Sequence, residues 1–522
     1  MFSSLVSLEG STYNRISQQV IDNLNLAETF AQLLEINEGE EAIIYQMCQD
    51  VETINFRQAI MKDFIKSPEL LVELVDQLKA FGRFRFKFEK ELEKSSKLYY
   101  LIELLLVVEA SVACLESLFQ TLCYYPIESE GLTNLKESVE AMMVTEQYKK
   151  MKEDQKAIRY IFKQIKSVEV SINMNTGMRP YEAQITEVNS HSYRYPKAFR
   201  KVSDALEVTD IYLGKRTRHY APLFSIERVN LDLMEEIEYA LKDHKAVISD
   251  FLHNYNKIDA LPFIHLHEEV TFYNAGMSFY KSLVDGGLWM NFPVVRAEQE
   301  LYLSFTDAYN LHLGNVLIKE GLQDELVANT LAINKGDVLL LTGANRGGKT
   351  TFTQMIGQLQ VLAQLGFPVP AKSSVVSICD VIATHFPMVE QAAVDFGRFG
   401  RACYEFKTAF NTLDRKSLLL MNESFSGTSH LESIEIASEV VQALVDKGIT
   451  TVYNTHLHEL YARTRGFGSV KSLSVGEVGR ESMYKVIEKE PRGFSQALDI
   501  AKAYGMTYEL LLQQLGGDHH ER

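Results

Sequence analysis

The sequence predicts a protein of several domains, in which a region of long helices with a small β insertion precedes an α/β domain built on a parallel sheet. Three observations support this fold class. A chain of 522 residues is too long for one hydrophobic core. Apolar residues recur at three- and four-residue spacing through most of the first half, as in amphipathic helices. From about residue 291 onward, short apolar runs alternate with helical patterns. We therefore place the domain boundary between residues 1–290 and 291–522.

Long helices are expected in three stretches of the first region. Residues 36–81 carry the helical spacing, and Ser67-Pro68 should open a new helix there, because proline suits the first helical turn. Residues 97–120 and 132–165 are each expected to form one further helix. The apolar run within 97–120 contains two glutamates, which favours a buried or coiled helix over a membrane-spanning one.

A change of period marks the β insertion, which we place at about residues 167–225. Val168, Val170 and Ile172 alternate with polar residues, as in a half-buried strand. Residues 181–188 are suited to be the partner strand.

The second region alternates strand and helix patterns. Apolar runs that end in "LLLTG", "LLLMNE" and "TVYNTH" predict buried strands, and amphipathic stretches that end at Gly366 and Gly448 predict helices. Such alternation predicts a parallel sheet covered by helices.

Composition narrows the class of protein. The chain is 46% hydrophobic and 23% charged, without a low-complexity tract, as in folded globular proteins. Its net charge of −16 argues against a surface that coats nucleic acid everywhere, although a local basic groove is compatible with it. The five cysteines are scattered, and the N-terminus lacks the pattern of a secretory signal. We expect a cytoplasmic protein with free thiols and no membrane partner.

The strongest motif is "GANRGGKT", which fits G-x-x-x-x-G-K-[ST] between a predicted strand and a predicted helix. Glycines let successive backbone N–H groups point at phosphate oxygens, and the helix N-terminus adds positive potential. The lysine would reach the outer phosphates of ATP, and the threonine hydroxyl would be a Mg²⁺ ligand. The alternative is a glycine-rich turn without a ligand. The residues of this loop expected to contact the nucleotide are Gly343, Ala344, Asn345, Arg346, Gly347, Gly348, Lys349, Thr350 and Thr351.

A second part of this site is expected where the strand "SLLLMNE" ends. Glu423 would orient or deprotonate the attacking water, which requires a carboxylate near the outer phosphate. The alternative is a strand-end glutamate with a local partner. Asn422 stands where nucleotide hydrolases with this motif usually carry aspartate. Its carbonyl can accept a proton from a metal-bound water but brings no charge, so we expect a softer Mg²⁺ contact and slower turnover.

A histidine follows the last predicted strand in "NTHLHEL". His456 is placed to sense or hydrogen-bond the outer phosphate, and we assign it a catalytic role beside Glu423. His458 would face elsewhere if the segment stays extended. A metal site built on this H-x-H pair is a weaker alternative.

Together, the P-loop, "ESFSGTS" and "THLHEL" resemble the ATPase domain of the MutS family of DNA mismatch-repair proteins, over about Asp337 to Ala462. The resemblance implies that residues 291–522 form an ABC-type P-loop ATPase domain that uses ATP and Mg²⁺. It also implies a homodimer through the ATPase domains, with each nucleotide held between two subunits. Asn329 resembles the family's asparagine near the nucleotide base, and Asp380 resembles a further family position.

The first region resembles the family as well. "INFRQAIMKDFIKSPEL" is similar to its core domain, and "SINMNTGMRPYEAQI" is similar to a segment of shorter MutS-like proteins. The resemblance therefore implies a core and lever region at 1–290, with the insertion at 167–225 in the place of a clamp.

Two departures from the family pattern bear on function. The expected signature helix lies in "VDFGRFGRACYEFKTAF", yet no serine occurs from Ile378 through Lys416 to complete a partner's site. Glu405 matches a family glutamate, and Gly400 and Arg401 are candidates for the missing role. The motif Phe-x-Glu of the family's mismatch readers does not occur in the sequence, so mismatch reading of that kind is not expected.

Two basic stretches are candidates for contact with DNA. "FGRFRFKFEK" would have one basic and one aromatic face as a strand, which suits stacking and phosphate contact. The alternative is a helix or turn with solvated charges over buried phenylalanines. "LGKRTRHY", at residues 213–220, is either a clamp contact or a solvated loop.

We expect an ATP-binding, MutS-like protein that acts as a dimeric, ATP-driven DNA clamp in repair or recombination without reading mismatches. A Mg²⁺-dependent ATPase is expected, slowed by Asn422 and the missing serine. The alternative is a weakly hydrolysing, ATP-binding regulatory protein that does not bind DNA; the acidic charge favours it.

Overall fold

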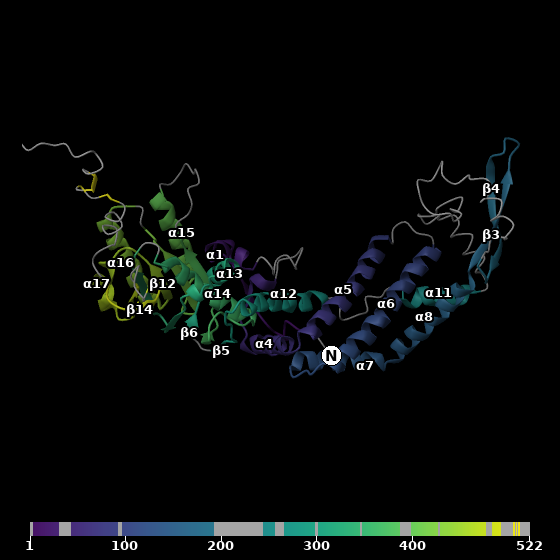
Figure 1. Ribbon diagram of the computed structural model, residues 1–522, viewed down its shortest axis with the longest axis horizontal. Coiled ribbons are helices and arrows are strands. Elements are labelled where there is room, and N and C mark those ends of the chain that lie inside the picture. Colours follow the sequence, from purple (N-terminus) through teal and green to yellow (C-terminus); the bar gives the residue numbers. More distant parts are fainter. Residues whose placement is uncertain are drawn as a thin grey trace, which may run out of the picture. The chain divides into compact units, whose positions relative to one another are not determined.

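The computed structural model describes residues 4–30, 43–91, 97–192, 244–255, 266–297, 301–344, 347–386, 398–425, 428–476, 483–491 and five positions between 505 and 511. The chain forms two compact units (Figure 1). Unit 1 comprises Met1–Phe2, Val72–Pro126 and Thr133–His267, and unit 2 comprises Ser3–Leu71, Ile127–Leu132 and Glu268–Arg522. This spatial division does not follow a boundary near residue 290, because residues 3–71 pack with the second region.

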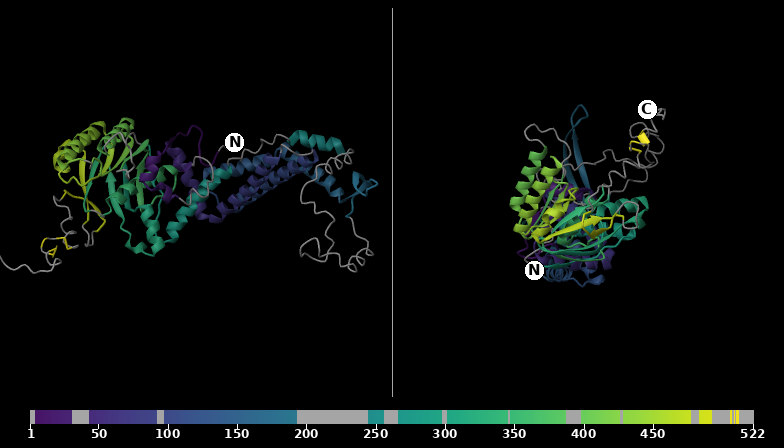
Figure 2. Two further views of the ribbon diagram at one scale, coloured as in Figure 1. Left: turned by 90° about the horizontal axis from the view of Figure 1, so that it is seen from above. Right: turned by 90° about the vertical axis from the view of Figure 1, so that its left-hand side faces the viewer.

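Unit 1 is built around the long helix α6 (Lys97–Tyr124), which lies alongside α8 (Glu146–Gln164) and α11 (Lys245–Tyr255) (Figure 2). Its shared core includes Leu104, Val108 and Ile158. Glutamates on α6 meet cations on α8: Glu109 accepts from Arg159, and Glu116 accepts from Lys152. The apolar run in α6 is therefore a packed helix, as expected, and no helix in the described part of the chain is long and apolar enough to cross a membrane.

Two further expectations concern helix boundaries. Residues 132–165 form two helices, α7 (Glu130–Met143) and α8, rather than the single helix expected. The break occurs at Thr145, whose hydroxyl accepts from the N–H of Tyr148 at 3.2 Å and so caps α8. In the stretch 36–81, the helical expectation is wrong for residues 43–48, because Ile43–Tyr45 form a 3-10 turn and Gln46–Cys48 a strand. The helix α4 (Val51–Lys66) ends before Ser67, and α5 (Pro68–Glu91) begins at the proline, as expected.

Helix α5 includes residues 81–90, the basic and aromatic stretch considered for DNA contact. The backbone there is helical, so the strand arrangement with one basic and one aromatic face is wrong. Residues 213–220 lie outside the described residues.

The region expected to be an insertion begins with an antiparallel hairpin of β3 (Ser167–Met174) and β4 (Pro180–Asn189). This pairing confirms the two strands expected there. The expected half-burial is wrong for the middle of β3, since Val170 and Ile172 are 45% and 53% exposed. Residues 193–225 of the expected insertion lie outside the described part of the chain.

Unit 2 contains a six-stranded sheet in the order β10-β11-β12-β8-β13-β14. Its first five strands are parallel, and β14 pairs antiparallel with β13. The parallel sheet predicted from the alternation is thus confirmed. The strands are β8 (Val338–Thr342), β10 (Val381–His385), β11 (Ser417–Asn422), β12 (Thr450–Asn454), β13 (Val470–Val475) and β14 (Val486–Glu488).

Helices cover both faces of this sheet, which is why its central strands are apolar on both sides. On one face, Leu419 and Met421 of β11 pack in a cluster with residues of α16 (His430–Lys447) and α15 (Arg398–Thr412). On the other face, Leu420 packs against α14 (Lys349–Leu365) at Gly357. Successive side chains point to opposite faces, and both faces are covered, so every residue of the run "SLLLM" is buried.

A smaller four-stranded sheet, in the order β5-β9-β6-β7, and a two-stranded sheet of β1 and β2 complete the β structure among the described residues. The small-sheet strands are β1 (Tyr13–Arg15), β2 (Gln46–Cys48), β5 (Val294–Arg296), β6 (Leu303–Ala308), β7 (Asn329–Ile333) and β9 (Ser373–Ser377). The remaining α-helices are α1 (Gln18–Asn23), α2 (Leu26–Thr29), α12 (Leu266–Asp285), α13 (Leu311–Glu320) and α17 (Leu460–Thr464).

The N-terminal segment is held to α14 by a row of buried and half-buried glutamines. Gln354 and Gln358 donate to the carbonyls of Asn23 and Leu24, at 2.8 and 2.9 Å. Gln364 donates to the carbonyl of Cys48 at 2.9 Å. These bonds satisfy backbone groups that would otherwise be buried without partners. They explain why residues 3–71 belong to unit 2.

Candidate functional site

The glycine-rich loop connects β8 to α14, as its pattern predicts. Gly343 and Gly348 have φ angles of 137° and 87°, which glycine tolerates and other residues rarely adopt. Gly348 is the N-cap of α14, so the first N–H groups of the helix face the loop. Asn345 and Arg346 lie outside the described residues.

Lys349 is the first residue of α14, and its side chain is folded back over the loop. Its ammonium group donates to the carbonyls of Gly343 and Ala344, at 3.0 and 2.9 Å. Lys349 is only 5% exposed. Burial lowers the pKa of this ammonium group, and the nearby charge of Glu423 opposes that shift. A buried cation whose hydrogen bonds, among the described residues, go to neutral carbonyls is well suited to bind a phosphate.

The parallel register places the ends of β11 and β12 beside the start of α14. Asn422 and Asn454 are cross-strand neighbours at these ends. The hydroxyl of Thr350 donates to Oδ1 of Asn422 at 3.3 Å. Asn454 donates from Nδ2 to Oδ1 of Asn422 and, at 3.4 Å, to the hydroxyl of Thr350. The two residues expected to serve the metal, Thr350 and Asn422, are therefore in contact, and Asn454 is a third member that sequence reasoning missed.

Glu423 and His456 meet directly after these strands. Oε1 of Glu423 accepts from Nε2 of His456 at 2.8 Å. Glu423 has a φ of 48°, a strained value for a residue with a side chain, and its N–H donates to the carbonyl of Asn454 at 2.8 Å. The two residues expected to be catalytic are thus brought together. Among the described residues, no group of three or more potential ligands is placed to hold a metal through histidine, cysteine or carboxylate alone.

A cavity of about 460 Å³ lies against the glycine-rich loop. Asn329 and Glu423 both line it, together with Thr350 and Thr351. Oδ1 of Asn329 accepts from the N–H of Val486 at 2.8 Å, so this side chain is fixed at the start of β7. The cavity unites the expected base-side residue, the loop and the expected catalytic carboxylate.

Tyr484 is a cavity residue that sequence reasoning missed. It has a φ of 65°, and its ring lies over Gly348, where a Cβ would come within 3.3 Å of the ring. The ring is 40% exposed and lines the cavity beside Asn329. An aromatic face in this position can stack on a planar ligand. No local pattern in the sequence signals this role, because Tyr484 lies just before β14 in a stretch without a motif.

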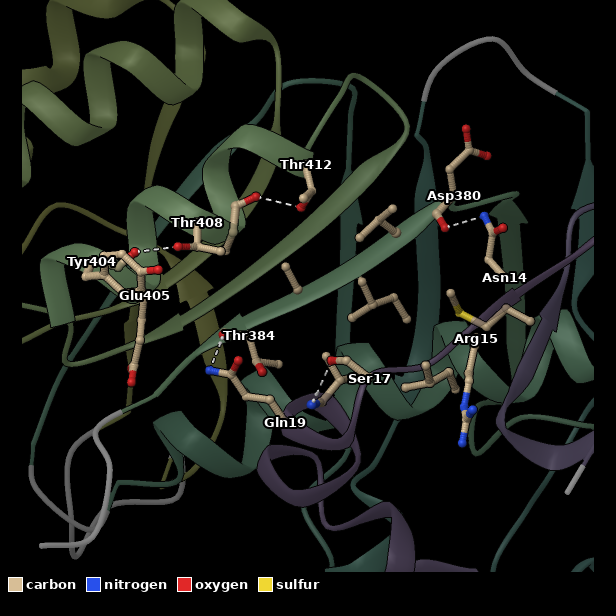
Figure 3. A pocket seen from close by; sticks show the side chains of 17 residues that line it. Asn14, Arg15, Ser17, Gln19, Asp380, Thr384, Tyr404, Glu405, Thr408 and Thr412 are labelled. Carbon is tan, nitrogen blue, oxygen red and sulfur yellow. Dashed lines mark hydrogen bonds between the residues drawn. The ribbon is translucent and has the colours of Figure 1, made fainter. Parts of the chain in front are cut away.

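A second cavity, of about 530 Å³, lies between the N-terminal segment and α15, with β10 between them (Figure 3). Asp380 and Glu405, the two further family positions, both line it. Asn14 donates to the carbonyl of Asp380 at 2.8 Å, and Arg401 donates to Glu405 at 2.9 Å. These residues therefore lie apart from the glycine-rich loop, in a separate cavity. Gly400 lies in the first turn of α15.

His385 joins α15 to the segment that follows β11. Its Nε2 donates to the carbonyl of Ala402 at 3.0 Å, and its Nδ1 lies 2.6 Å from the hydroxyl of Ser424. The imidazole is buried between Phe406 and Phe425, and burial lowers its pKa. Since Ser424 directly follows Glu423, this histidine helps to fix the segment that carries the carboxylate.

A strand–loop–helix phosphate site at the carboxyl edge of a parallel sheet, with a carboxylate and a histidine on the neighbouring strands, defines a P-loop nucleotide-binding domain. Residues 339–512 match the model of MutS domain V, an ABC-type ATPase domain, and residues 49–285 match the model of the MutS2 N-terminal domain. The chain belongs to the MutS family.

Individual relatives agree with this assignment. The chain is 31% identical over 195 residues to the DNA mismatch repair protein MutS of Clostridium kluyveri, a match that covers 36% of this chain and 22% of that protein. It is 29% identical over 211 residues to the DNA mismatch repair protein MutS of Clostridium botulinum, covering 38% and 23%. The chain thus matches less than a quarter of the length of these curated relatives.

Proposed function

We propose that this chain binds ATP with Mg²⁺ at the glycine-rich loop and hydrolyses it slowly. The observation that carries the proposal is the single cavity lined by Lys349, Thr350 and Glu423. A phosphate-binding cation, a metal-binding hydroxyl and a carboxylate for water activation are the parts that phosphoryl transfer to water requires.

Each residue has a role in this proposal. The loop N–H groups and Lys349 bind the phosphates, and Tyr484 stacks on the base beside Asn329. Glu423 orients the attacking water or accepts its proton. His456 donates a hydrogen bond to Glu423 at 2.8 Å, and it would respond to the outer phosphate when that group is bound.

The oxygen atoms beside Thr350 fit a Mg²⁺ site. They are the hydroxyl of Thr350 and the side-chain carbonyl of Asn422, whose oxygen atoms lie 3.3 Å apart. Hard oxygen donors are the ligands that Mg²⁺ prefers. When bound with the nucleotide, Mg²⁺ would neutralise charge on the phosphate oxygens. The donor set is uncharged at Asn422, which favours slow turnover.

We further propose that the chain acts on DNA as a homodimer, as an ATP-driven clamp that does not read mismatches. The support is the family membership together with the printed name of the relatives, DNA mismatch repair protein. The absence of serine from 378 to 416 leaves Gly400 and Arg401 as candidates to meet the partner's nucleotide.

A second candidate is an ATP-binding regulatory protein that hydrolyses poorly and does not bind DNA. Two observations favour it: the net charge of −16 and the neutral Asn422 beside Thr350. Both candidates require the same nucleotide site, so they differ only in partner and rate.

Steady-state ATP hydrolysis by wild type and Glu423→Gln tests the nucleotide part. We expect the variant to bind an ATP analogue normally and to hydrolyse ATP at least about 100-fold more slowly than wild type, as for loss of a general base. The matched control is Glu439→Gln on the exposed face of α16, which should behave as wild type. Equal turnover in Glu423→Gln and wild type would show that the assignment of Glu423 is wrong.

Fluorescence anisotropy with duplex, branched and single-stranded DNA separates the two candidates. A clamp predicts binding that weakens as salt rises, because phosphate contacts release counterions. Absence of binding at low salt, with and without ATP, would refute the clamp and favour the regulatory protein. Sedimentation with and without ATP tests the homodimer.

A further inference from the structure

The metal side of the proposed site contains a pair of asparagines. Asn422 ends β11 and Asn454 ends β12, and the sheet register places them opposite one another. Nδ2 of Asn454 donates to Oδ1 of Asn422 and to the hydroxyl of Thr350. Asn454 is fully buried, whereas Asn422 is half-buried. One buried amide therefore contacts both residues that are expected to serve the metal.

An amide at position 422 creates an orientation problem that a carboxylate does not have. A carboxylate has two equivalent oxygens, so either rotamer offers an acceptor to a metal or to its bound water. An amide has one oxygen and one NH₂ group, and a cation is repelled if the NH₂ group is the one that faces it. Asn422 can serve a metal only when its carbonyl oxygen is turned toward Thr350.

The contact with Asn454 selects that orientation. Two amides that face each other must present a donor to an acceptor, so Nδ2 of Asn454 requires the oxygen of Asn422. If both amides were turned round, the buried outer end of Asn454 would be an NH₂ group without an acceptor. In the observed arrangement that end is Oδ1, which has no hydrogen-bond partner among the residues that the structure describes. A buried carbonyl without a partner is better tolerated than a buried N–H donor without one.

We propose that Asn454 is a positioning residue for the metal site, which turns the carbonyl of Asn422 toward Thr350 and so allows an uncharged residue to serve Mg²⁺. This inference rests on the proposed binding of ATP with Mg²⁺. Its specific consequence is that metal affinity depends on Asn454 only while residue 422 is an amide. With aspartate at 422, the orientation no longer depends on the neighbour.

A double-mutant cycle tests this dependence. The variants are Asn454→Ala, Asn422→Asp and the double variant, with Asn454→Ser as a second loss of the amide in case alanine impairs folding. The readout is the affinity for Mn²⁺, used as a paramagnetic substitute for Mg²⁺, measured by electron paramagnetic resonance with a non-hydrolysable ATP analogue. Affinity for the analogue without metal and the melting temperature are measured in parallel as controls for fold.

We expect Asn454→Ala to weaken Mn²⁺ binding about tenfold when residue 422 is asparagine, as for loss of an outer-shell partner of a metal ligand. With aspartate at 422 the same change should alter Mn²⁺ affinity by less than about twofold. Within each background, Asn454→Ala should leave the metal-free affinity for the analogue unchanged.

Equal weakening in both backgrounds would show a general structural role for Asn454 and overturn the inference. No weakening in the Asn422 background would overturn it as well. If wild type binds the analogue with Mn²⁺ but the two changes are independent, the inference alone fails. If wild type binds neither the analogue nor Mn²⁺, the proposed function fails together with the inference.

Discussion

A buried arginine anchors the end of α14, and its replacement offers a quantitative test of the packing. Arg57 lies on α4 and is 1% exposed. Its Nε donates to the carbonyl of Val6 at 2.7 Å, and Nη1 donates to the carbonyl of Leu365 at 3.3 Å. Leu365 is the last residue of α14, where the helix dipole is negative and a cation is favourable. The guanidinium also lies 5.4 and 5.3 Å from the ring centres of Tyr13 and Phe272.

The change Arg57→Met keeps a long, flexible side chain but removes every donor. The carbonyl of Leu365 then loses its guanidinium donor, and the carbonyl of Val6 keeps the longer bond of 3.4 Å from the hydroxyl of Tyr13. Each unsatisfied buried group costs on the order of 1–3 kcal/mol. Burial of the thioether in place of a charged group offsets part of this loss. We therefore expect the free energy of unfolding to fall by about 3 kcal/mol. For a unit of this size, the melting temperature should drop by roughly 5 °C or more.

Thermal and urea unfolding of wild type, Arg57→Met and Arg57→Lys measures this effect. Arg57→Lys keeps the charge but cannot serve separate acceptors as a planar fork does, so it should fall between the other two. The control is Arg463→Met on the surface, whose ion pair with Glu435 is exposed and should contribute little. If Arg57→Met is within about 0.5 kcal/mol of wild type, as is usual for surface substitutions, the anchoring account is wrong.

Three further predictions follow from single contacts. Gly366→Ala should destabilise unit 2 by at least about 1 kcal/mol in urea unfolding, because Gly366 has a φ of 83° and its Cβ would lie 2.6 Å from Cβ of Arg57. His385 has a pKa lowered by burial from 6.5, so wild type should lose stability as the pH falls below 6.5, where the unfolded chain binds the proton first. His385→Phe should lose that pH dependence, and melting temperatures at pH 7.5 and 5.5 that still differ by the wild-type amount would contradict it. Tyr484→Ala should weaken binding of a fluorescent ATP analogue by about 5- to 100-fold, since stacking on a base contributes roughly 1–3 kcal/mol; Tyr484→Phe, which keeps the ring, should bind as wild type.

The glycine-rich loop, Glu423 and His456 could be placed from the sequence because they depend on local patterns. A strand that ends at Thr342 and a helix that begins at Lys349 fix the loop between them. The carboxyl ends of parallel strands meet at one edge of a sheet, so Glu423 and His456 had to lie near the loop once the strands were recognised. Their hydrogen bond at 2.8 Å is a consequence of that topology.

Other site residues could not be placed, because no local pattern reports on long-range register. Asn454 ends a strand like many polar residues, and only its pairing with Asn422 gives it a role. Tyr484 reaches the loop from the turn before β14, more than 130 residues further along the chain. The prediction of one helix over 132–165 was wrong for the opposite reason. The cap at Thr145 is a local signal, but the continuous apolar period on both sides of it favoured a single helix.

The sequence by itself determined which local elements the chain carries: a glycine-rich loop, a strand-end carboxylate and a parallel sheet, each encoded within a few neighbouring residues. Tertiary structure alone decided how that chemistry is supported. It buries Arg57 under the end of α14, joins residues 3–71 to the nucleotide-binding unit and turns Asn422 toward Thr350. The physical reason is that burial and hydrogen-bond partners depend on segments that are tens to hundreds of residues apart, whereas propensity and loop chemistry depend on neighbours along the chain.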